Sequence, residues 1–134
     1  MKKKATSRIV VTLLLISMIP LGFNVRAVGA AGTIYIRADG SVEGTTYVVS
    51  GDNVTYVFTT DIDGSIIVER NKIIIDGQGY TLQGEGSGIG FSLSTVSNVT
   101  IKNTNIKNFD YGIGLVDSSN NSITANNITA NNRN

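Results

Sequence analysis

The chain has 134 residues, with one Pro, two Met and no Cys, His or Trp. Disulfide bonds are therefore excluded, and the residue types that bind copper (Cys, His and Met) are represented only by Met1 and Met18. The formal net charge is +1, but residues 31–134 carry six basic and ten acidic side chains, a net charge of −4. A segment this acidic lacks the basic surface that nucleic acids require, so no nucleic-acid partner is expected.

Residues 1–30 have the pattern of a secretory signal peptide. A basic start at residues 2–4 precedes an apolar run at residues 9–21, and small side chains at residues 28–31 suit signal peptidase. We expect this segment to be helical and to be cleaved after Ala30. Pro20 interrupts the run, which is shorter than the roughly 20 apolar residues of a membrane-spanning helix. A retained N-terminal anchor is the alternative; in both cases the protein is secreted or displayed at the cell surface.

Residues 31–60 are predicted to form a small N-terminal β cap. Residues 33–37 alternate apolar and polar side chains and end at the turn pair Asp39-Gly40. Two further strands are predicted within residues 46–49 and 54–59, separated by the polar turn 50–53. A cap is expected because the uncovered apolar end of a repeat protein would bind another chain.

Residues 61–134 repeat in steps of about two dozen residues. Gly88-Ile89-Gly90-Phe91 returns as Gly112-Ile113-Gly114-Leu115, and segment 98–106 returns 22 positions later as 120–128. A unit this short buries its apolar face only by stacking on its neighbours. Short strands rich in β-branched residues and separated by Gly, Asn, Asp and Ser predict an all-β fold. We expect a right-handed parallel β-helix of about 2.5 coils of 22–27 residues.

Three columns of inward side chains are expected in these coils. Each column runs along equivalent strands of successive coils. Where a strand contributes two inward side chains, they are two residues apart, because alternate residues of a strand face the same side. The first column is Ile66 and Val68, Ile89 and Phe91, Ile113 and Leu115; the second is Ile74, Ile101 and Ile123; the third is Leu82, Ile106 and Ile128.

Asparagine is concentrated towards the end of the chain, where 11 of the 37 residues from 98 to 134 are Asn. Asn tolerates the left-handed backbone of tight turns, and stacked Asn side chains can form hydrogen-bonded ladders. A disordered Asn-rich tail is the alternative, against which the regular spacing of Ile residues argues. Sequons for N-glycosylation occur at Asn53, Asn98, Asn120 and Asn127. We expect Asn53 to be the best acceptor, and Asn98 and Asn120 to form a structural ladder.

These segments together resemble a known family. The segments are 33–42 (TIYIRADGSV), 64–84 (GSIIVERNKIIIDGQGYTLQG) and the two Asn-rich coils. They look like the start of archaeal secreted right-handed parallel β-helix proteins, which carry the NosD-type periplasmic copper-binding β-helix domain and belong to the pectin-lyase-like superfamily. Members usually continue for many more coils. The resemblance, together with the need of a solenoid for a terminal cap, leads us to expect an N-terminal fragment or a truncated gene product, with further coils of the same protein as the partner of the last coil. A complete protein is the alternative.

The resemblance also suggests copper delivery or polysaccharide cleavage, and the residues support neither here. Residues 31–134 contain no Cys, His or Met, so no copper site of that kind can form in them. Glycoside hydrolysis needs two opposed carboxyl groups, and lyases of this family use acid-bound calcium with a basic residue as proton acceptor. No two acids align in adjacent coils, because the position of Asp76 is taken by Asn103 and Ala125 in the following coils. Asp61-Ile62-Asp63-Gly64 superficially suggests a calcium loop but is expected to be a β-turn. The other acids considered are Asp110, Asp117 and Glu69, and Glu69 is expected to form a solvent-exposed pair with Arg70.

Carbohydrate binding requires fewer specifically placed residues than catalysis does. Sugars are held by aromatic faces together with amide and carboxylate groups, and Tyr80, Phe109 and Tyr111 lie at or near turns beside such groups. Core packing of Tyr80 and Phe109 is the alternative. We expect a secreted or cell-surface scaffold or adhesive module without catalysis in this segment, and without cofactor, for which surface polysaccharide or another envelope protein is the candidate partner. The alternative is the first part of a polysaccharide lyase or glycoside hydrolase, and a third possibility is a copper-maturation protein.

Overall fold

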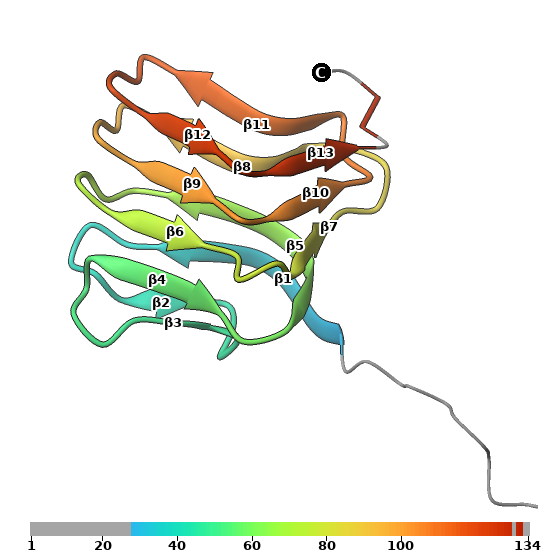
Figure 1. The fold of residues 1–134 in the computed structure, drawn as a ribbon, viewed down its shortest axis with the longest axis horizontal. Helices are drawn as coiled ribbons and strands as arrows, with labels where there is room; N and C mark the ends of the chain where they lie inside the picture. The colour runs from blue at the N-terminus through green and yellow to red at the C-terminus, as the bar shows by residue number, and fades with distance from the viewer. Residues whose placement is uncertain (1–27, 130, 133–134) are drawn as a thin grey trace, which may run out of the picture.

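The computed structural model describes residues 28–129, 131 and 132, and the expected signal-peptide helix at residues 1–27 lies outside them. The described residues form thirteen strands and no helix, wound into a β-solenoid of about three turns (Figure 1). Successive coils stack along one axis, and parallel strands of adjacent coils lie side by side. The predicted all-β, parallel β-helix class is confirmed. Among the described residues no helix is long and apolar enough to span a membrane.

Two sheets form the walls of the solenoid. The larger sheet contains β1 (Val28–Ile36), β2 (Val42–Glu43), β5 (Asp61–Val68), β7 (Thr81–Gln83), β8 (Ile89–Ser94), β10 (Asn105–Lys107), β11 (Tyr111–Val116) and β13 (Asn127–Thr129). Its order is β11-β8-β5-β7-β10-β13, with β1 paired to β5 and β2 to β1. The smaller sheet, in the order β12-β9-β6-β4-β3, contains β3 (Val48–Val49), β4 (Thr55–Phe58), β6 (Ile74–Asp76), β9 (Thr100–Lys102) and β12 (Ser122–Thr124).

The segment expected to be a cap contributes two strands to the stack itself. Strand β1 pairs in parallel with β5, and β4 pairs in parallel with β6. Only β2 and β3 are antiparallel to their neighbours, and they lie at the N-terminal end of the stack (Figure 1). Residues 61–64, expected to form a turn, belong instead to β5, because their backbone pairs with both β1 and β7.

The inward columns follow a register that differs from the expected one at two places. Ile66 pairs with Phe91 rather than with Ile89, and Ile89 pairs with Tyr111. Ile75, rather than Ile74, pairs with Ile101. The first error arises because the connection between β7 and β8 is longer than its equivalent in the next coil.

The second error arises because the corner after β5 is one residue shorter: Val68 and Ile75 are seven positions apart, whereas the equivalent Leu93 and Ile101 are eight apart. Ile75 is fully buried, and Ile74 is only partly buried. The third column is confirmed, since Leu82, Ile106 and Ile128 pair in successive coils.

The core fills the first coil (β5 to β7) and the second coil (β8 to β10), and it thins out at the third and last coil (β11 to β13). Phe58 and Phe91 stack across it with ring centroids 6.4 Å apart. Leu115, Ile123 and Ile128, expected to point inward, keep 48%, 41% and 36% of their surface exposed. Ile123 and Ile128 stack on Ile101 and Ile106 as expected, whereas Leu115 stacks on Leu93 rather than on Phe91. No described strand lies beyond β11, β12 and β13 to cover these three side chains.

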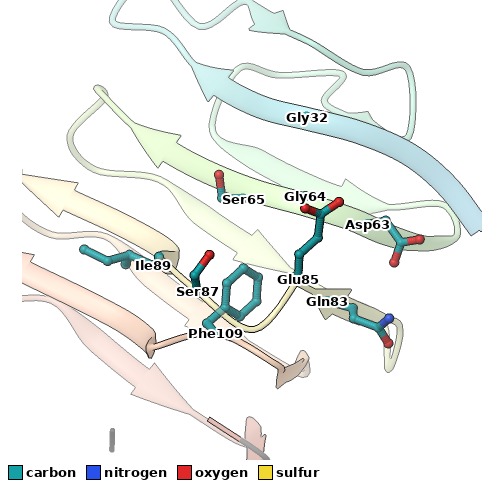
Figure 2. A pocket seen from close by; sticks show the side chains of 11 residues that line it. Gly32, Asp63, Gly64, Ser65, Gln83, Glu85, Ser87, Ile89 and Phe109 are labelled. Carbon is teal, nitrogen blue, oxygen red and sulfur yellow. The ribbon is translucent and has the colours of Figure 1, made fainter. Parts of the chain in front are cut away.

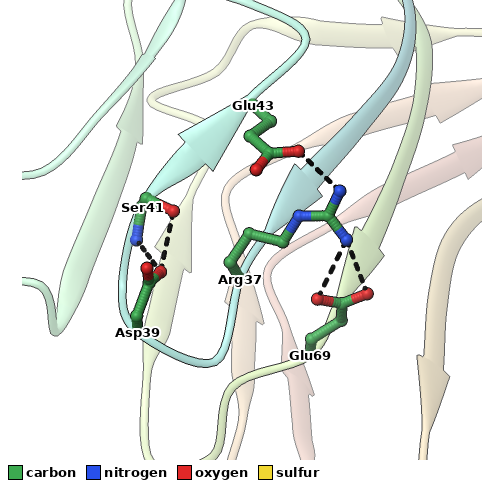
Figure 3. Close-up of polar contacts among 5 residues, drawn as sticks. All are labelled: Arg37, Asp39, Ser41, Glu43 and Glu69. Carbon is green, nitrogen blue, oxygen red and sulfur yellow. Dashed lines mark hydrogen bonds and ion pairs between the residues drawn. The ribbon is translucent and has the colours of Figure 1, made fainter.

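An ion-pair network joins the cap to the first coil. Arg37 donates hydrogen bonds to both carboxylate oxygens of Glu69, at 3.0 and 3.2 Å, and a further one to Glu43 (Figure 3). The hydrogen bonds to Glu43 and Glu69 raise the pKa of Arg37 above its usual value. Glu69 is therefore not paired with Arg70 as expected, since Arg70 instead donates to the backbone carbonyls of residues 38 and 53.

Candidate functional site

A hollow of about 360 Å³ opens on the outside of the larger sheet, where β5 changes neighbours. The start of β5 pairs with β7 and its end pairs with β8, so the chain between those two strands must leave the sheet and return. That connection, residues 84–88, forms one wall (Figure 2). The hollow lies at the lower end of the volume range of small-molecule sites. Its lining residues are Gly32, Asp63, Gly64, Ser65, Gln83, Gly84, Glu85, Ser87, Gly88, Ile89 and Phe109.

Glycine shapes the wall formed by residues 84–88. A Cβ atom at Gly84 would lie 2.4 Å from the ring of Phe109, so only glycine lets this aromatic ring pack under the loop. Gly86 and Gly88 have φ values of 91° and 77°, the left-handed region in which glycine is unstrained. The loop therefore has a backbone path that few other sequences could follow.

The next two coils fix this loop through polar side chains. Asn108 donates to the carbonyl oxygen of Gly84 at 2.7 Å, and Asp110 accepts from the backbone N–H of Gly88 at 3.1 Å. Asn132 donates to the carbonyl oxygen of Gly86 at 2.9 Å. A wall held at three points is pre-organised, which lowers the entropic cost of ligand binding.

Two carboxylates at the hollow are not engaged by the rest of the fold. Seven of the ten acidic side chains in the described segment form a hydrogen bond or ion pair within it. Asp63 and Glu85 form none with the residues that the structure describes, and both line the hollow (Figure 2). The lining includes no basic side chain. The hollow therefore presents negative charge and hydrogen-bond acceptors to a ligand.

A row of polar side chains continues from the hollow across successive coils. Asp63 pairs in register with Gln83, Gln83 with Lys107, and Lys107 with Thr129. Their neighbours on each strand point inward, so these four side chains lie on the outer face of the sheet. Adjacent strands are about 4.8 Å apart, so the row spans roughly 15 Å. It offers a carboxylate, an amide, an ammonium and a hydroxyl group in a line.

The three aromatic residues considered for sugar contacts lie in different environments. Phe109 lines the hollow but is otherwise buried, with 2% of its surface exposed, so it contributes an apolar floor rather than an open stacking face. Tyr80 and Tyr111 are exposed by 37% and 41%. Tyr111 pairs with Ile89, a lining residue, and so lies beside the hollow; Tyr80 directly precedes β7.

Asp76, the acid with most resemblance to a catalytic position, is engaged in the fold. In the structure it pairs in register with Lys102, not with Asn103, and the Lys102 ammonium lies 3.2 Å from its carboxylate. Burial raises the pKa of Asp76, but hydrogen bonds from Gln78, Asn103 and Lys102 outweigh this and lower the pKa below its usual value. Asp76 is thus an ionised structural group.

The other candidate acids also have defined surroundings. Asp61 accepts a hydrogen bond from the backbone N–H of Thr81 at 2.8 Å, and Asp110 fixes the 84–88 loop. Asp117 lies exposed in the turn after β11. Within the described residues no group of three or more acids comes together as a metal site. Calcium therefore has no ligand cluster there that supports it.

The four sequon asparagines are all exposed, and Asn53, Asn98 and Asn120 have the positive φ values expected of turns. The expected ladder between Asn98 and Asn120 is wrong in its position. Asn98 donates to Ser97, and the side chain that reaches the coil below is that of Asn121. The ladder bonds are made to backbone groups rather than to another Asn side chain.

Gln83, Glu85 and the two serines of the hollow were not predicted from the sequence. A signal was present: Gly84-Glu85-Gly86-Ser87-Gly88 is a glycine-rich insertion that carries one acid, two residues longer than the equivalent connection 108–110. Comparison of the chain with protein-family models, with curated proteins and with solved structures found no match.

Proposed function

We propose that this chain is part of a secreted or cell-surface β-helix scaffold that binds carbohydrate at the hollow beside β5, without catalysis in this segment. The observation that carries the proposal is the hollow itself, which holds the two unengaged carboxylates of Asp63 and Glu85 and from which a row of polar side chains continues, beginning at Asp63. Carboxylate, amide and hydroxyl groups are the side chains that hydrogen-bond sugar hydroxyls. An elongated polar surface suits a polymer better than a single small molecule.

The charge of the hollow selects among carbohydrates. At the hollow itself, Asp63 and Glu85 would repel the carboxylates of a uronate polymer, because no basic side chain lies among the lining residues; Lys107, the one basic side chain of the row, lies two strands away from Asp63. They would attract a sugar that carries a protonated amine and would accept hydrogen bonds from neutral sugars. We therefore expect the order of affinity to be amine-bearing oligosaccharide, neutral oligosaccharide, then uronate.

Titration calorimetry with oligomers of glucosamine, glucose and galacturonate tests this proposal. Glu85→Gln is expected to weaken glucosamine binding about tenfold, the usual scale for loss of one charged hydrogen bond. Asp117→Asn removes the same charge from an exposed site outside the hollow and is the matched control. Absence of binding by all three oligomers would rule out a carbohydrate site, and equal weakening by both variants would rule out this location.

The alternative is the first part of a polysaccharide lyase or glycoside hydrolase, as the resemblance to pectin-lyase-like proteins implies. The two carboxylates at one hollow favour it, since glycoside hydrolysis uses a pair of acids. New reducing ends, released by the wild type but not by Glu85→Gln, would establish hydrolysis; new unsaturated ends, seen as ultraviolet absorbance, would establish a lyase. The NosD-type resemblance carries no copper function to this segment, which has no Cys, His or Met after residue 30.

Secretion with cleavage after Ala30 remains part of the proposal. Residues 28–30 pair with residues 61–63 at the start of β5, so cleavage there would shorten β1 and leave that part of β5 without its neighbour. The pairings from Thr33 to Ile36 would be kept. Mass spectrometry of the protein recovered from culture medium measures the N-terminus directly, and an intact N-terminus in a membrane fraction would instead establish a retained anchor.

A further inference from the structure

One part of the larger sheet carries two parallel rows of outward side chains. It consists of β7, β10 and β13 together with the first residues of β5, and we call it the β7 wall. Each of its strands places one outward residue on either side of an inward residue of the third column or of Ile62. The outward residues are Asp61, Thr81, Asn105 and Asn127 in the first row, and Asp63, Gln83, Lys107 and Thr129 in the second.

Only the second row offers charge to a ligand. In the first row, Asp61 accepts a hydrogen bond from the backbone N–H of Thr81 at 2.8 Å, and Asn105 donates to the carbonyl oxygen of Gly79 at 2.7 Å. In the second row, neither Asp63 nor Lys107 forms an ion pair or a side-chain hydrogen bond with the residues that the structure describes. The β7 wall therefore presents free negative charge at the hollow and free positive charge at Lys107.

The distance between these charges is fixed by the sheet. Lys107 lies two strands away from Asp63, and the neutral side chain of Gln83 lies between them. Two strand spacings correspond to roughly 10 Å. This is about one Debye length at physiological salt, so the two charges attract each other only weakly across the solvent. Each of them is thus left for an opposite charge on a ligand.

We propose that this row selects a zwitterionic oligosaccharide, with a protonated amine at the hollow and a carboxylate that meets Lys107. The inference rests on the proposed carbohydrate binding at the hollow and adds the order and spacing of the charges. A neutral sugar ring between the two charged rings lies over Gln83, whose amide both donates to and accepts from hydroxyl groups. An oligosaccharide of amine-bearing rings alone brings positive charge to Lys107, and one of uronates alone brings negative charge to the hollow.

An extended peptide with one lysine and one glutamate carries the same charges but fits this wall less well. Peptides add to a sheet at a free strand edge, where backbone groups pair. The row instead crosses the face of strands that already pair with one another. Peptide N–H and C=O groups would find few partners there, and unpaired polar groups reduce affinity. Sugar hydroxyl groups donate and accept along every ring, which matches a row of separate polar side chains.

Titration calorimetry on the whole chain at about pH 6, where an amine is protonated, tests the charge order. The zwitterionic probe is the trisaccharide glucosamine–glucose–glucuronate, and the reference probe has glucose in place of the glucuronate. We expect the zwitterionic probe to bind about fivefold more tightly, the upper range for an exposed ion pair. Lys107→Gln should abolish this gain and leave the affinity for the reference probe unchanged within about twofold. A gain that persists in Lys107→Gln would overturn the proposal.

Lys72→Gln is the matched control for the loss of positive charge. Lys72 lies exposed at the corner between β5 and β6 and has no part in the row, so this variant should keep the full gain. Equal loss of the gain in both variants would show a general charge effect and would overturn the role of Lys107. Raising the salt concentration from about 0.05 to about 0.5 M should also remove the gain, because salt screens an exposed pair.

Further probes separate the spacing and the class of ligand from carbohydrate binding itself. A disaccharide with the amine and the carboxylate on adjacent rings brings the carboxylate only as far as Gln83 and should show no gain; an equal gain would refute the spacing. A peptide of one lysine and one glutamate separated by two glycines should bind more weakly, and equal affinity would refute the choice of an oligosaccharide. If the reference probe binds and the glucuronate adds nothing, carbohydrate binding stands and the charge order falls. If no probe binds, both proposals fall.

Discussion

Asn121, Asn126 and Asn131 each accept a hydrogen bond from a backbone N–H of the coil beneath and donate one to a backbone carbonyl oxygen there. Asn126→Ala tests how much such a pair of bonds stabilises the fold. This substitution removes the acceptor for the N–H of Thr104, which is 1% exposed, and the donor to the carbonyl of Ile101. A net hydrogen bond contributes about 1 kcal/mol, and a buried N–H left unpaired costs about 1–3 kcal/mol. We therefore expect the free energy of unfolding to fall by about 2–3 kcal/mol. In a fold of this size that corresponds to a drop of roughly 10–15 °C in the unfolding midpoint.

Asn127→Ala provides the matched control. Asn127 is the next residue, is equally an asparagine, and lies exposed on β13, where its backbone N–H rather than its side chain bonds to Thr104. Its replacement should change the free energy of unfolding by less than about 0.5 kcal/mol, as for other surface substitutions. Thermal unfolding by circular dichroism, with hydrogen exchange at Thr104 in parallel, measures both variants. Equal losses in the two, or unchanged exchange at Thr104 in Asn126→Ala, would refute the stabilising role given to the Asn126 side chain.

Five further substitutions, two of them matched controls, test the packing and the charges. Gly84→Ala should lower the free energy of unfolding by about 2 kcal/mol in a denaturant titration because its Cβ would overlap the Phe109 ring, whereas Gly51→Ala, with no atom within 4 Å of its Cβ, should be nearly neutral. In the same titration, Ile75→Ala should lower the free energy of unfolding by about 2–5 kcal/mol, and Ile74→Ala should lower it clearly less, because only Ile75 is fully buried. The reverse order would contradict the register between β6 and β9. Because the folded-state pKa of Asp76 is lowered, the ionised carboxylate stabilises the fold above about pH 4, and this contribution is lost as the pH falls below that value. The free energies of unfolding of the wild type and Asp76→Asn, measured as the pH is lowered, should therefore converge below about pH 4.

The repeat in the sequence was enough to predict the class of fold and part of the core. Ile101, Ile106, Ile123 and Ile128 recur at a step of 22, and strands of this length with turn residues between them have few alternatives to stacking. The turns at Asn98 and Asn120 were predicted for the right reason, since both residues take positive φ. Where successive coils have equal length, apolar positions alone determine the register.

The register between the first and second coils could not be obtained in this way. Ile89 and Phe91 are both apolar and two residues apart, so either could have stacked on Ile66, and only backbone pairing distinguishes them. Ile73, Ile74 and Ile75 give a similar ambiguity, because three consecutive isoleucines carry no alternation. A shift of one residue moves a side chain to the other face, so a small error in corner length changes which residue is buried.

The same irregularity that obscured the register creates the hollow. The connections from β8 to β9 and from β11 to β12 each span five residues, so this corner keeps its length between coils. The connection from β7 to β8 is two residues longer than that from β10 to β11, yet the strands on either side keep their pairing. The extra residues must therefore bulge outward, and they do so as the glycine-rich wall that carries Glu85. In this solenoid the regular part of the repeat provides stability, and a departure from it forms the hollow at which we propose that a ligand binds.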